Sequence, residues 1–338
     1  MNVKKKILIT GVAGFLGSHL AERFIKLGHE VIGVDNMIGG YEDNISNKIK
    51  FYKFDCCDLK NIDLIMKNVD VVYHCAATAH EGLSVFSPIE ITKNNYLASI
   101  TIITSAIKHD VKRIIYCSSM ARYGQGKTPF TEEMEPKPID PYGISKVAVE
   151  NVLINLCNLN NIQWVIAVPH NIIGPRQKYD DPFRNVVSIM LNRMLLGKGP
   201  IIFGDGNQMR CFSYIDDCIY CLLKMFDSPE VNKQIINIGP DEEFVTINKI
   251  AELCKNITGS NLNPIYKKER PQEVNKATCS ANKARKLLKY KTSTDLYTGI
   301  KKTYEYIKKR GCKPFDYSKL HLEIINSKTP DVWINKEI

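Results

Sequence analysis

Short apolar runs and amphipathic stretches alternate along the first half of the chain. The apolar runs have the length of buried strands, and the stretches between them repeat their apolar residues at helical spacing. This pattern predicts strands over 7–10, 30–35, 49–54, 69–75, 111–118 and 163–168, with helices over 16–27, 61–67, 88–109 and 141–158. Because strand and helix alternate repeatedly, we expect a doubly wound parallel α/β sheet.

The rhythm of the pattern changes after Pro169. A loop is predicted over 170–184, and the strands become short and widely spaced. Helices are predicted over 185–196, 216–227, 246–258, 282–288 and 295–310, and strands over 201–203 and 265–266. We therefore expect three parts: a sheet domain (1–170), a smaller α/β part that returns some strands to the sheet (171–311), and a C-terminal tail of unclear structure (312–338).

Three glycines, Gly11, Gly14 and Gly17, stand between the first predicted strand and the first predicted helix. A glycine turn at that place lets backbone N–H groups and the positive end of the helix dipole meet a phosphate. Asp35 ends the second strand, where a carboxylate can accept a hydrogen bond from a ribose 2′-hydroxyl. Together these features predict a Rossmann dinucleotide site. Asp35 favours NAD over NADP, because a carboxylate would repel a 2′-phosphate.

The net charge is +10, so we consider first whether the chain binds nucleic acid. From Leu262 onward, 18 Lys and Arg residues stand against 8 Asp and Glu, but they are spread over helices and loops. We interpret them as solvated faces and expect no nucleic-acid partner. No apolar run approaches the roughly 20 residues that span a bilayer, and the first strand follows the N-terminus without room for a signal peptide. These observations predict a cytoplasmic protein without a membrane partner.

The chain has 11 cysteines, and without a secretion signal we expect them to be free thiols. Cys218 and Cys221 have C-x-x-C spacing, but no second Cys or His pair follows at zinc-site distance. They fall in an apolar predicted helix, so core packing is the favoured interpretation and no metal site is expected.

Candidate chemistry is carried by Tyr142 and Lys146, which share one face of a predicted helix at positions i and i+4. An ammonium near a phenol favours the phenolate, so Tyr142 is a candidate general base. Ser119 ends the preceding strand and could hydrogen-bond the same substrate hydroxyl. The alternative, an incidental Tyr and Lys on a surface helix, is disfavoured by the strand ending in Ser-Ser and by the glycine turn.

A set of ordered blocks resembles the extended short-chain dehydrogenase/reductases, specifically the nucleotide-sugar epimerases and dehydratases. The resemblance runs from Lys6 to about Gly311. Its blocks are TGVAGFLGSHL, VDN at 34–36, the acidic turn around Asp58-Leu59, HCAA at 74–77, CSSMARYG at 117–124, DPYGISK at 140–146, VPHNIIGPRQ at 168–177, FGDGNQMRCFSYIDD at 203–217 and RPQEV at 270–274.

The resemblance implies a tightly bound, recycled NAD and a hydride cycle at C4 of a sugar, with 171–311 mainly binding the nucleotide-sugar. Tyr142 would take the hydroxyl proton, Lys146 would bind the nicotinamide ribose and lower the pKa of Tyr142, and Ser119 would polarise the sugar oxygen. The implied cofactor contacts are Gly11, Gly14, Phe15, Leu16, Gly17, Asp35, Asn36, Asp58, Leu59, Ala76, Ala77, Asn95, Tyr142, Lys146 and Pro169. Among them, Asp58 and Leu59 would contact adenine.

The implied substrate contacts lie mostly in the second half of the chain. They are Ser119, Asn171, Phe203, Arg210, Arg270 and Ala277. Asn171, Arg210 and Arg270 would hold the diphosphate, for which a guanidinium fork is well suited. Phe203 would pack against the nucleotide base, although a plain core position is an equal alternative.

Four observations choose among the reactions of this family. Met120 and Ala121 stand where the dehydratases, and decarboxylases that resemble them, carry a proton-transferring acid. Asp35 disfavours the exchangeable NADPH of a reductase. No Cys matches the second acid/base of C3 and C5 epimerases. Ser119, Tyr142 and Lys146 are all present, which disfavours a non-catalytic NAD-binding module. We therefore expect an isomerase, an NAD-dependent C4 epimerase of a UDP-hexose or UDP-N-acetylhexosamine.

Two positions bear on the sugar. Ala277 falls seven residues after Arg270, where the epimerases have a gate position, and a small side chain there favours an N-acetyl group. Lys178 could instead pair with a uronate carboxylate, although a solvated loop charge is the preferred interpretation. An epimerase of a UDP-uronate or another NDP-sugar therefore stays as the alternative.

The family usually dimerises through two long helices, here near 88–109 and 141–158. These helices would form a four-helix bundle across a two-fold axis. The first carries Tyr96, Ile100, Ile103 and Ile107 at helical spacing, but such a stripe could equally face the protein's own sheet. A homodimer is therefore expected mainly from the resemblance.

Overall fold

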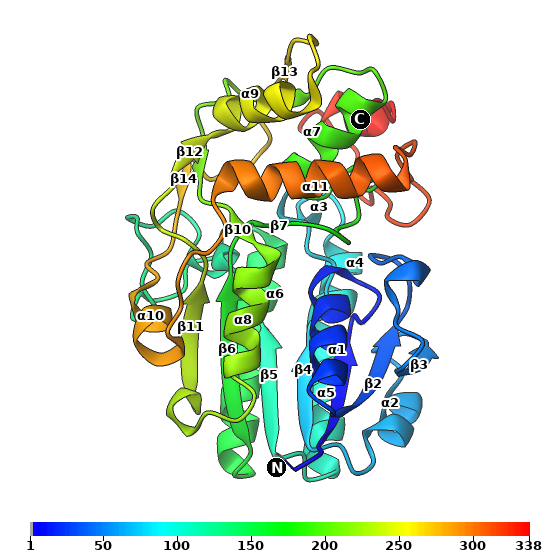
Figure 1. The fold of residues 1–338 in the computed structure, drawn as a ribbon, viewed down its shortest axis with the longest axis vertical. Helices are drawn as coiled ribbons and strands as arrows, with labels where there is room; N and C mark the ends of the chain where they lie inside the picture. The colour runs from blue at the N-terminus through cyan, green and yellow to red at the C-terminus, as the bar shows by residue number, and fades with distance from the viewer. Residues whose placement is uncertain (1–2) are drawn as a thin grey trace.

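The computed structural model describes residues 3–338. Within them, seven parallel strands form the main sheet in the order β11-β6-β5-β4-β1-β2-β3 (Figure 1). The order reverses beside β1, which makes the carboxyl ends of β1 and β4 the expected ligand crevice. The strands are β1 (Lys6–Thr10), β2 (Glu30–Asp35), β3 (Lys50–Lys53), β4 (Val71–His74), β5 (Arg113–Cys117), β6 (Gln163–Pro169) and β11 (Gln234–Ile238).

A layer of helices covers each face of this sheet. Successive side chains of each strand point to opposite faces, so both faces carry apolar side chains that the helices cover. On β1, Ile7 and Ile9 belong to one apolar core and Leu8 to the other. The first layer contains α1 (Phe15–Lys26), α8 (Ile215–Lys224) and α10 (Asn282–Leu288). The second contains α2 (Leu59–Met66), α5 (Ala98–Lys108) and α6 (Pro141–Leu159). The predicted doubly wound α/β architecture is confirmed.

Residues after β6 build a smaller part above the carboxyl edge of the sheet (Figure 1). Its helices α7 (Val186–Leu195), α9 (Ile247–Thr258) and α11 (Leu296–Arg310) share a third apolar core. β11 leaves this part and pairs with β6 at the edge of the main sheet. Its short strands are β7 (Ile172–Ile173), β8 (Ile201–Phe203), β9 (Met209–Arg210), β10 (Ser213–Tyr214), β12 (Val245–Thr246), β13 (Ile265–Lys267) and β14 (Lys276–Ala277).

Several elements differ from the predicted pattern. The loop expected after β4 contains a helical turn, α3 (Glu81–Ser84). The long helix expected over 88–109 is divided into α4 (Pro88–Ile91), a π-helical turn η2 (Thr92–Leu97) and α5. Short 3-10 turns were also not predicted: η1 (Glu42–Asn44), η3 (Met120–Tyr123) and η4 (Pro229–Val231). The α-, 3-10 and π-helical turns have similar numbers of residues per turn, and each of these turns is short. The spacing of apolar residues therefore cannot distinguish them.

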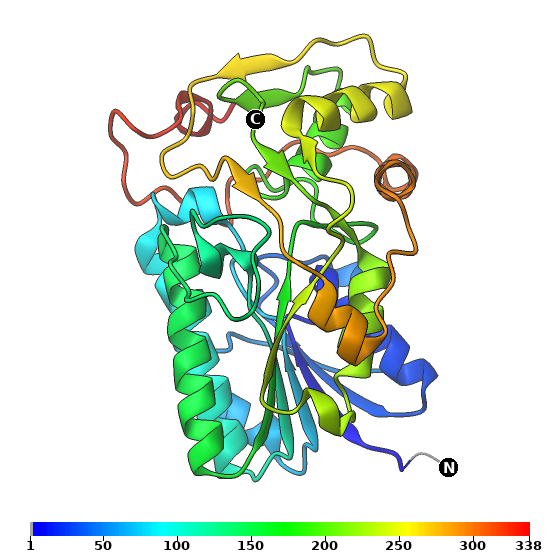
Figure 2. The same ribbon diagram turned by 90° about the vertical axis from the view of Figure 1, so that its left-hand side faces the viewer.

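The C-terminal segment 312–338, which the sequence left without structure, is packed onto the molecule. It ends in α12 (Asp331–Ile334) and shares a fourth apolar core with residues of α3 and α7. Figure 2 shows it above the segment that carries α3 and α4. Backbone N–H groups of Glu323 and Ile324 donate to the Phe86 carbonyl at 2.8 and 2.9 Å. The tail is therefore an ordered part of the fold.

Candidate active site

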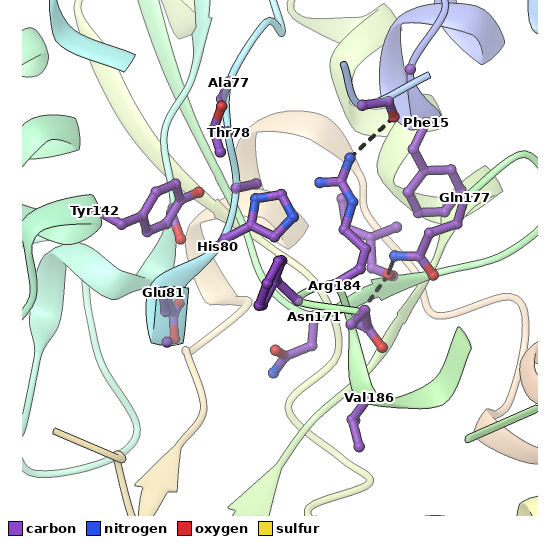
Figure 3. Close-up of a pocket in the computed structure, with 18 of the residues that line it drawn as sticks. Phe15, Ala77, Thr78, His80, Glu81, Tyr142, Asn171, Gln177, Arg184 and Val186 are labelled. Carbon is purple, nitrogen blue, oxygen red and sulfur yellow. Dashed lines mark hydrogen bonds between the residues drawn. The ribbon is translucent and has the colours of Figure 1, made fainter. Parts of the chain in front are cut away.

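One cavity of about 400 Å³ lies over the carboxyl edge of the sheet, beneath the smaller part (Figure 3). Most residues expected to bind ligands line it, although they come from segments far apart in the chain. They are Gly11, Gly14, Phe15, Leu16, Asp35, Asn36, Ala76, Ala77, Ser119, Tyr142, Lys146, Pro169, Asn171, Phe203, Arg210 and Arg270.

The glycine turn has the close backbone packing that requires glycine. Gly11 has a φ of +70°, and a Cβ there would lie 2.9 Å from the backbone of Ala76. A Cβ on Gly17 would lie 2.2 Å from the Gly11 carbonyl oxygen. Gly17 does not line the cavity itself. Its role is to let the first turn of α1 approach Gly11, which presents the helix N-terminus to the cavity.

The end of β4 is held against the glycine turn by the Thr10 side chain. The Thr10 hydroxyl oxygen accepts hydrogen bonds from the N–H groups of Cys75 and Ala76, both at 3.1 Å. The same hydroxyl lies 2.7 Å from Nδ1 of the buried His74. These bonds position Ala76 and Ala77 opposite Gly11, across the crevice between β1 and β4.

Asp35 lies at the cavity wall with its carboxylate fixed by the backbone. Its two oxygens accept hydrogen bonds from Ala13 N at 2.9 Å and from Met37 N at 2.7 Å. Burial raises the pKa of Asp35, and these backbone hydrogen bonds oppose the rise. Asp35 lines the cavity, so its carboxylate can still accept a hydrogen bond from a ribose hydroxyl.

The structure places Asp58 and Leu59, the expected adenine contacts, outside the lining of the cavity. Asp58 is the N-cap of α2 and accepts from Asn61 N at 3.1 Å, and neither it nor Leu59 lines the cavity. Asp55 and Cys56, three residues earlier, line it instead. The chain reaches the cavity where β3 ends, and the capping of α2 then draws Asp58 away.

Asn95 does not line the cavity either, but it shapes the segment that does. Its side chain accepts from Thr78 N at 2.8 Å and donates to Thr78 O at 3.1 Å. The neighbouring Asn94 lines the cavity and donates to Thr78 Oγ1 at 3.0 Å. Both asparagines lie in the π-helical turn η2, whose wider turn brings two consecutive side chains to the same loop.

Ser119, Tyr142 and Lys146 meet at the inner end of the cavity, as predicted. Asp140 caps α6 by accepting from Gly143 N at 2.8 Å, which fixes the start of the helix that carries Tyr142. Ser119 caps the 3-10 turn η3, and its side chain interacts with the Tyr142 hydroxyl. The Lys146 ammonium lies 5.7 Å from the Tyr142 ring centroid. The three side chains therefore lie together in one part of the cavity.

The electrostatics of this trio differ from the expectation. Burial raises the pKa of Tyr142, and the Ser119 interaction opposes the rise only in part. The Lys146 ammonium donates to the Cys117 carbonyl at 2.9 Å and also lies over the Tyr142 ring. Burial also lowers the pKa of Lys146 to about 8. In the chain alone, desolvation thus outweighs the attraction between ammonium and phenolate.

Glu81 is a cavity residue that the sequence did not single out. It begins α3 and lies on the same side of the cavity as Tyr142 (Figure 3). Glu81 is accessible at the cavity, where the surrounding protein partly desolvates its carboxyl group. Burial, and then the charge of Asp140, raise the pKa of Glu81 to about 7. The Glu81 carboxylate in turn raises the pKa of Tyr142.

We predict that Glu81→Gln moves the acidic limb of the pH profile of kcat/KM to lower pH. The substitution removes a negative charge that opposes ionisation of Tyr142, so the phenolate forms at lower pH. The measurement is the position of the limb, since the height also responds to substrate contacts. Glu135→Gln is the control, because Glu135 is 79% exposed and pairs with Lys137. A limb at the wild-type pH would contradict the prediction.

The outer end of the cavity carries two arginines that share one carboxylate. Glu273 binds Arg210 at 3.1 Å and Arg270 at 2.6 Å. The Arg270 guanidinium lies over the Phe203 ring, 4.8 Å from its centroid. Two guanidinium groups on one carboxylate leave a net positive charge, which suits a diphosphate. The sequence identified Arg210, Arg270 and Phe203, but not the role of Glu273 between them.

The two positions considered for sugar selectivity do not line the cavity. Ala277 is buried in β14, 4% exposed, where it lies opposite Arg210 of β9 and belongs to the second apolar core. Lys178 is buried and pairs with Asp180 at 2.8 Å, so neither a solvated charge nor a uronate contact describes it. Asn171 does line the cavity, and its side chain donates to the Cys211 carbonyl at 2.9 Å.

A cationic group that the sequence missed faces the cavity from the loop before α7. Arg184 reaches across to donate to the Gly39 carbonyl at 3.2 Å (Figure 3). Behind it, Asp181 lies 2.8 Å from His80 Nε2. Burial alone would raise the pKa of Asp181, but His80 and Arg184 outweigh it and lower that pKa. No motif marks these residues, because only the folded loop brings 80, 181 and 184 together.

The geometry defines a dinucleotide-binding α/β protein with a Ser-Tyr-Lys trio. The sequence profile of the NAD dependent epimerase/dehydratase family matches residues 7–239, and the chain belongs to that family. It is 35% identical to a Methanocaldococcus jannaschii protein provisionally named a UDP-glucose 4-epimerase, over 89% of this chain and 98% of the relative. It is 29% identical to a Bacillus cytotoxicus UDP-N-acetyl-alpha-D-glucosaminuronate decarboxylase, over 90% of this chain and 98% of the relative.

One solved structure matches this chain with an identity and a coverage similar to those of the Methanocaldococcus protein. The UDP-glucose 4-epimerase of Thermotoga maritima, determined with UDP-glucose, superimposes with a TM-score of 0.86 at 33% identity. The match covers 90% of this chain and 99% of the Thermotoga chain. Within residues 3–338, no helix is both long and apolar enough to cross a membrane.

Proposed function

We propose that this protein is an NAD-dependent isomerase that inverts C4 of a UDP-sugar through a transient 4-keto sugar. The observation that carries the proposal is one cavity with Ser119, Tyr142 and Lys146 at its inner end and a pair of arginines at its outer end. Such a cavity places a sugar hydroxyl on the trio while a diphosphate lies on the guanidinium groups. The named epimerases among the relatives support the same reaction.

The residues around the glycine turn fit NAD. A Cβ at Gly11 would lie 2.9 Å from the backbone of Ala76 and narrow the crevice beside the helix N-terminus, and Asp35 offers a carboxylate for the adenosine ribose. We propose that Asp55 and Cys56 take the adenine contacts first expected of Asp58 and Leu59. Lys146 would hold the nicotinamide ribose. NAD, when bound, supplies the hydride acceptor and the positive nicotinamide charge.

In the proposed reaction, the Tyr142 phenolate takes the proton of the C4 hydroxyl as the C4 hydride leaves. Ser119 donates a hydrogen bond to the sugar oxygen and stabilises the ketone. The 4-keto sugar then turns and presents its other face, while Arg210 and Arg270 keep the diphosphate in place. When the hydride returns to C4, Tyr142 gives the proton back to the oxygen. No net oxidation occurs, so the cofactor is recycled.

The substrate we favour is a UDP-hexose or UDP-N-acetylhexosamine. Met120 and Ala121 are buried and cannot transfer protons, which argues against dehydration or decarboxylation at these positions. Lys178 is paired with Asp180 away from the cavity, which removes the cation once considered for a uronate. Arg184 keeps a UDP-uronate as the alternative, because it is a cation that faces the cavity.

The test is incubation with UDP-glucose, UDP-N-acetylglucosamine and UDP-glucuronate, without added cofactor, followed by proton NMR. We expect a C4-inverted product from one of the first two. Deuterium placed at C4 of that substrate should remain in the product, because the hydride never leaves the site. A product from UDP-glucuronate alone would support the alternative. No C4-inverted product from any of the three would contradict the proposal.

We also propose a homodimer through η2, α4, α5 and α6. The structure leaves apolar side chains exposed on these elements: Ile89 is 75% exposed, Leu97 50% and Ile144 53%. Of the predicted stripe, Ile103 is buried in the protein's own core, and Tyr96, Ile100 and Ile107 pack against it. The dimer face would therefore use the exposed apolar positions Ile89, Leu97 and Ile144, whose side chains a partner surface would remove from water.

The double variant Leu97→Lys, Ile144→Lys is expected to be monomeric, with the mass measured by light scattering after size exclusion. In a two-fold symmetric interface the same surface of both subunits meets, so both introduced ammonium groups are present on each side. These buried charges have no partner of opposite sign and therefore oppose association. Leu27→Lys is the control, because Leu27 is 59% exposed at the end of α1, away from this face. An unchanged mass for the double variant would argue against this interface.

A further inference from the structure

The C-terminal segment reaches the cavity that the proposed function uses. Trp333 and Ile338 both line it, at the end that carries Phe203 and Arg270. Trp333 is 3% exposed and Ile338 4% exposed, so both are packed into the fold rather than lying on its surface. Residues more than 300 positions apart in the sequence, Phe15 and Trp333, thus belong to one site.

The segment is held in place along its whole length. Near its start, Asp316 N donates to the Asp180 carbonyl at 2.7 Å. In its middle, the Glu323 carboxylate accepts from Ile89 N and Glu90 N, at 2.9 and 2.8 Å, and so caps α4. At its end, Arg193 Nη1 donates to the Glu337 carbonyl at 2.9 Å. These anchors come from three separate elements, which fixes the position of α12.

The Trp333 indole holds the two groups expected to meet the nucleotide. Its ring lies 6.0 Å from the Phe203 ring in an edge-to-face arrangement, and the Arg270 guanidinium lies 6.0 Å from its centroid. Gly82 gives the indole room, because a Cβ there would lie 3.3 Å from Trp333 Cη2 and 3.1 Å from Arg270 Nη1. The buried indole N–H has no hydrogen-bond partner among residues 3–338.

The end of the cavity that carries Phe203, Arg270 and Trp333 offers contacts for a planar nucleotide base and for a phosphate beside it. Two aromatic rings offer apolar and edge contacts to a flat heterocycle, and Arg270 stands between them and the Glu273 carboxylate. The three relatives described above match over 98–99% of their own length but only 89–90% of this chain. About a tenth of this chain therefore lies outside each of these matches.

We propose that Trp333, carried by the C-terminal segment, is a binding residue of the nucleotide-sugar site. It closes the end that receives the pyrimidine base and holds Phe203 and Arg270 against that base and its phosphate. The proposal deepens the proposed function and rests on it for the identity of the ligand. Its test uses nucleotide binding as well as turnover, so that the two can fail separately.

The chain contains two tryptophans, Trp164 and Trp333. Trp164 lies near the start of β6, does not line the cavity, and donates to Asn158 Oδ1 at 3.2 Å. In the full-length Trp164→Phe protein, all indole emission comes from Trp333. Titration with UDP is expected to change that emission with saturation, while Trp333→Phe, which keeps only Trp164, stays silent. Emission that does not change although calorimetry detects UDP binding would overturn the proposal.

Kinetics provide the second readout. Trp333→Ala is expected to raise KM for the UDP-sugar about 10-fold or more, the usual effect of truncating an aromatic anchor. We expect kcat within about 3-fold of wild type and unchanged NAD content, because Ser119, Tyr142 and Lys146 do not touch the segment. Ile325→Ala is the matched control, since Ile325 is 62% exposed in the same segment.

If Trp333→Ala does not fold, Trp333→Phe replaces it and keeps an aromatic ring in the core. If the Trp333 variant loses kcat and bound NAD to the same extent while its KM stays unchanged, the segment only supports the fold. That result would overturn the proposal. If wild type shows no epimerase activity but the UDP-dependent emission change is present, the proposed reaction fails while the nucleotide role of Trp333 stands.

Discussion

Tyr142→Phe is expected to retain NAD and the fold but to lose turnover, with kcat lower by about 10²- to 10⁴-fold. The substitution removes only the hydroxyl that takes and returns the C4 proton. The ring remains packed against Ile91 and Ala121. The measurement is kcat by NMR or a coupled assay, with NAD content determined on the same preparation.

Tyr123→Phe is the matched control for this loss. Tyr123 is 2% exposed, as buried as Tyr142, but its hydroxyl donates to Asn237 Oδ1 at 2.8 Å and does not face the cavity. Removing that hydroxyl should cost about 1 kcal/mol of stability and leave kcat near wild type. A Tyr142→Phe protein with more than about a tenth of wild-type kcat would exclude Tyr142 as the general base.

Gly17→Ala is the second substitution with a large expected effect, namely loss of bound NAD. The new Cβ would lie 2.2 Å from the Gly11 carbonyl oxygen and 2.9 Å from Val12 Cα. Both contacts are backbone atoms that cannot rotate away, so α1 must shift and the turn must open. We expect overpacking to cost about 1–3 kcal/mol and the purified protein to contain little NAD, measured by its release after denaturation.

Gly28→Ala separates that effect from a general glycine effect. Gly28 has a φ of +84° at the end of α1, and a Cβ there meets no atom within 4 Å. The strained φ should cost about 1 kcal/mol, but the turn at Gly11 stays intact, so NAD should be retained. If both variants keep NAD, the close approach of Gly17 to Gly11 is not what shapes the cofactor site.

Local patterns explain why much of the site was predictable. The glycine turn and Asp35 are close in sequence and adjacent in one βαβ unit, so spacing alone implies their geometry. The i and i+4 spacing of Tyr142 and Lys146 likewise implies a shared helix face. Thr246 caps α9 in the same local way, because its side chain accepts from Lys249 N at 3.1 Å. In each case the interacting groups lie within one or two consecutive elements.

Predictions failed where the outcome depended on neighbours in space. Burial raises the pKa of Tyr142, and burial is a property of the whole fold, so the i and i+4 spacing of Tyr142 and Lys146 does not record it. Asp58 was placed at the adenine by its motif, yet capping of α2 turns it away and leaves Asp55 and Cys56 at the cavity. Ala277 was expected at a gate beside the sugar and Lys178 was preferred as a solvated loop charge, but both are buried and neither lines the cavity.

The sequence by itself determined the doubly wound sheet, the cofactor preference and the Ser119, Tyr142 and Lys146 trio, because periodicity and short-range spacing encode them. Only the tertiary structure decided which distant segments complete the cavity. Glu81, Arg184 and Trp333 carry no motif, and each reaches the site through a loop or tail whose path depends on packing against other elements. Such paths are set by long-range contacts, which no local pattern of residues records.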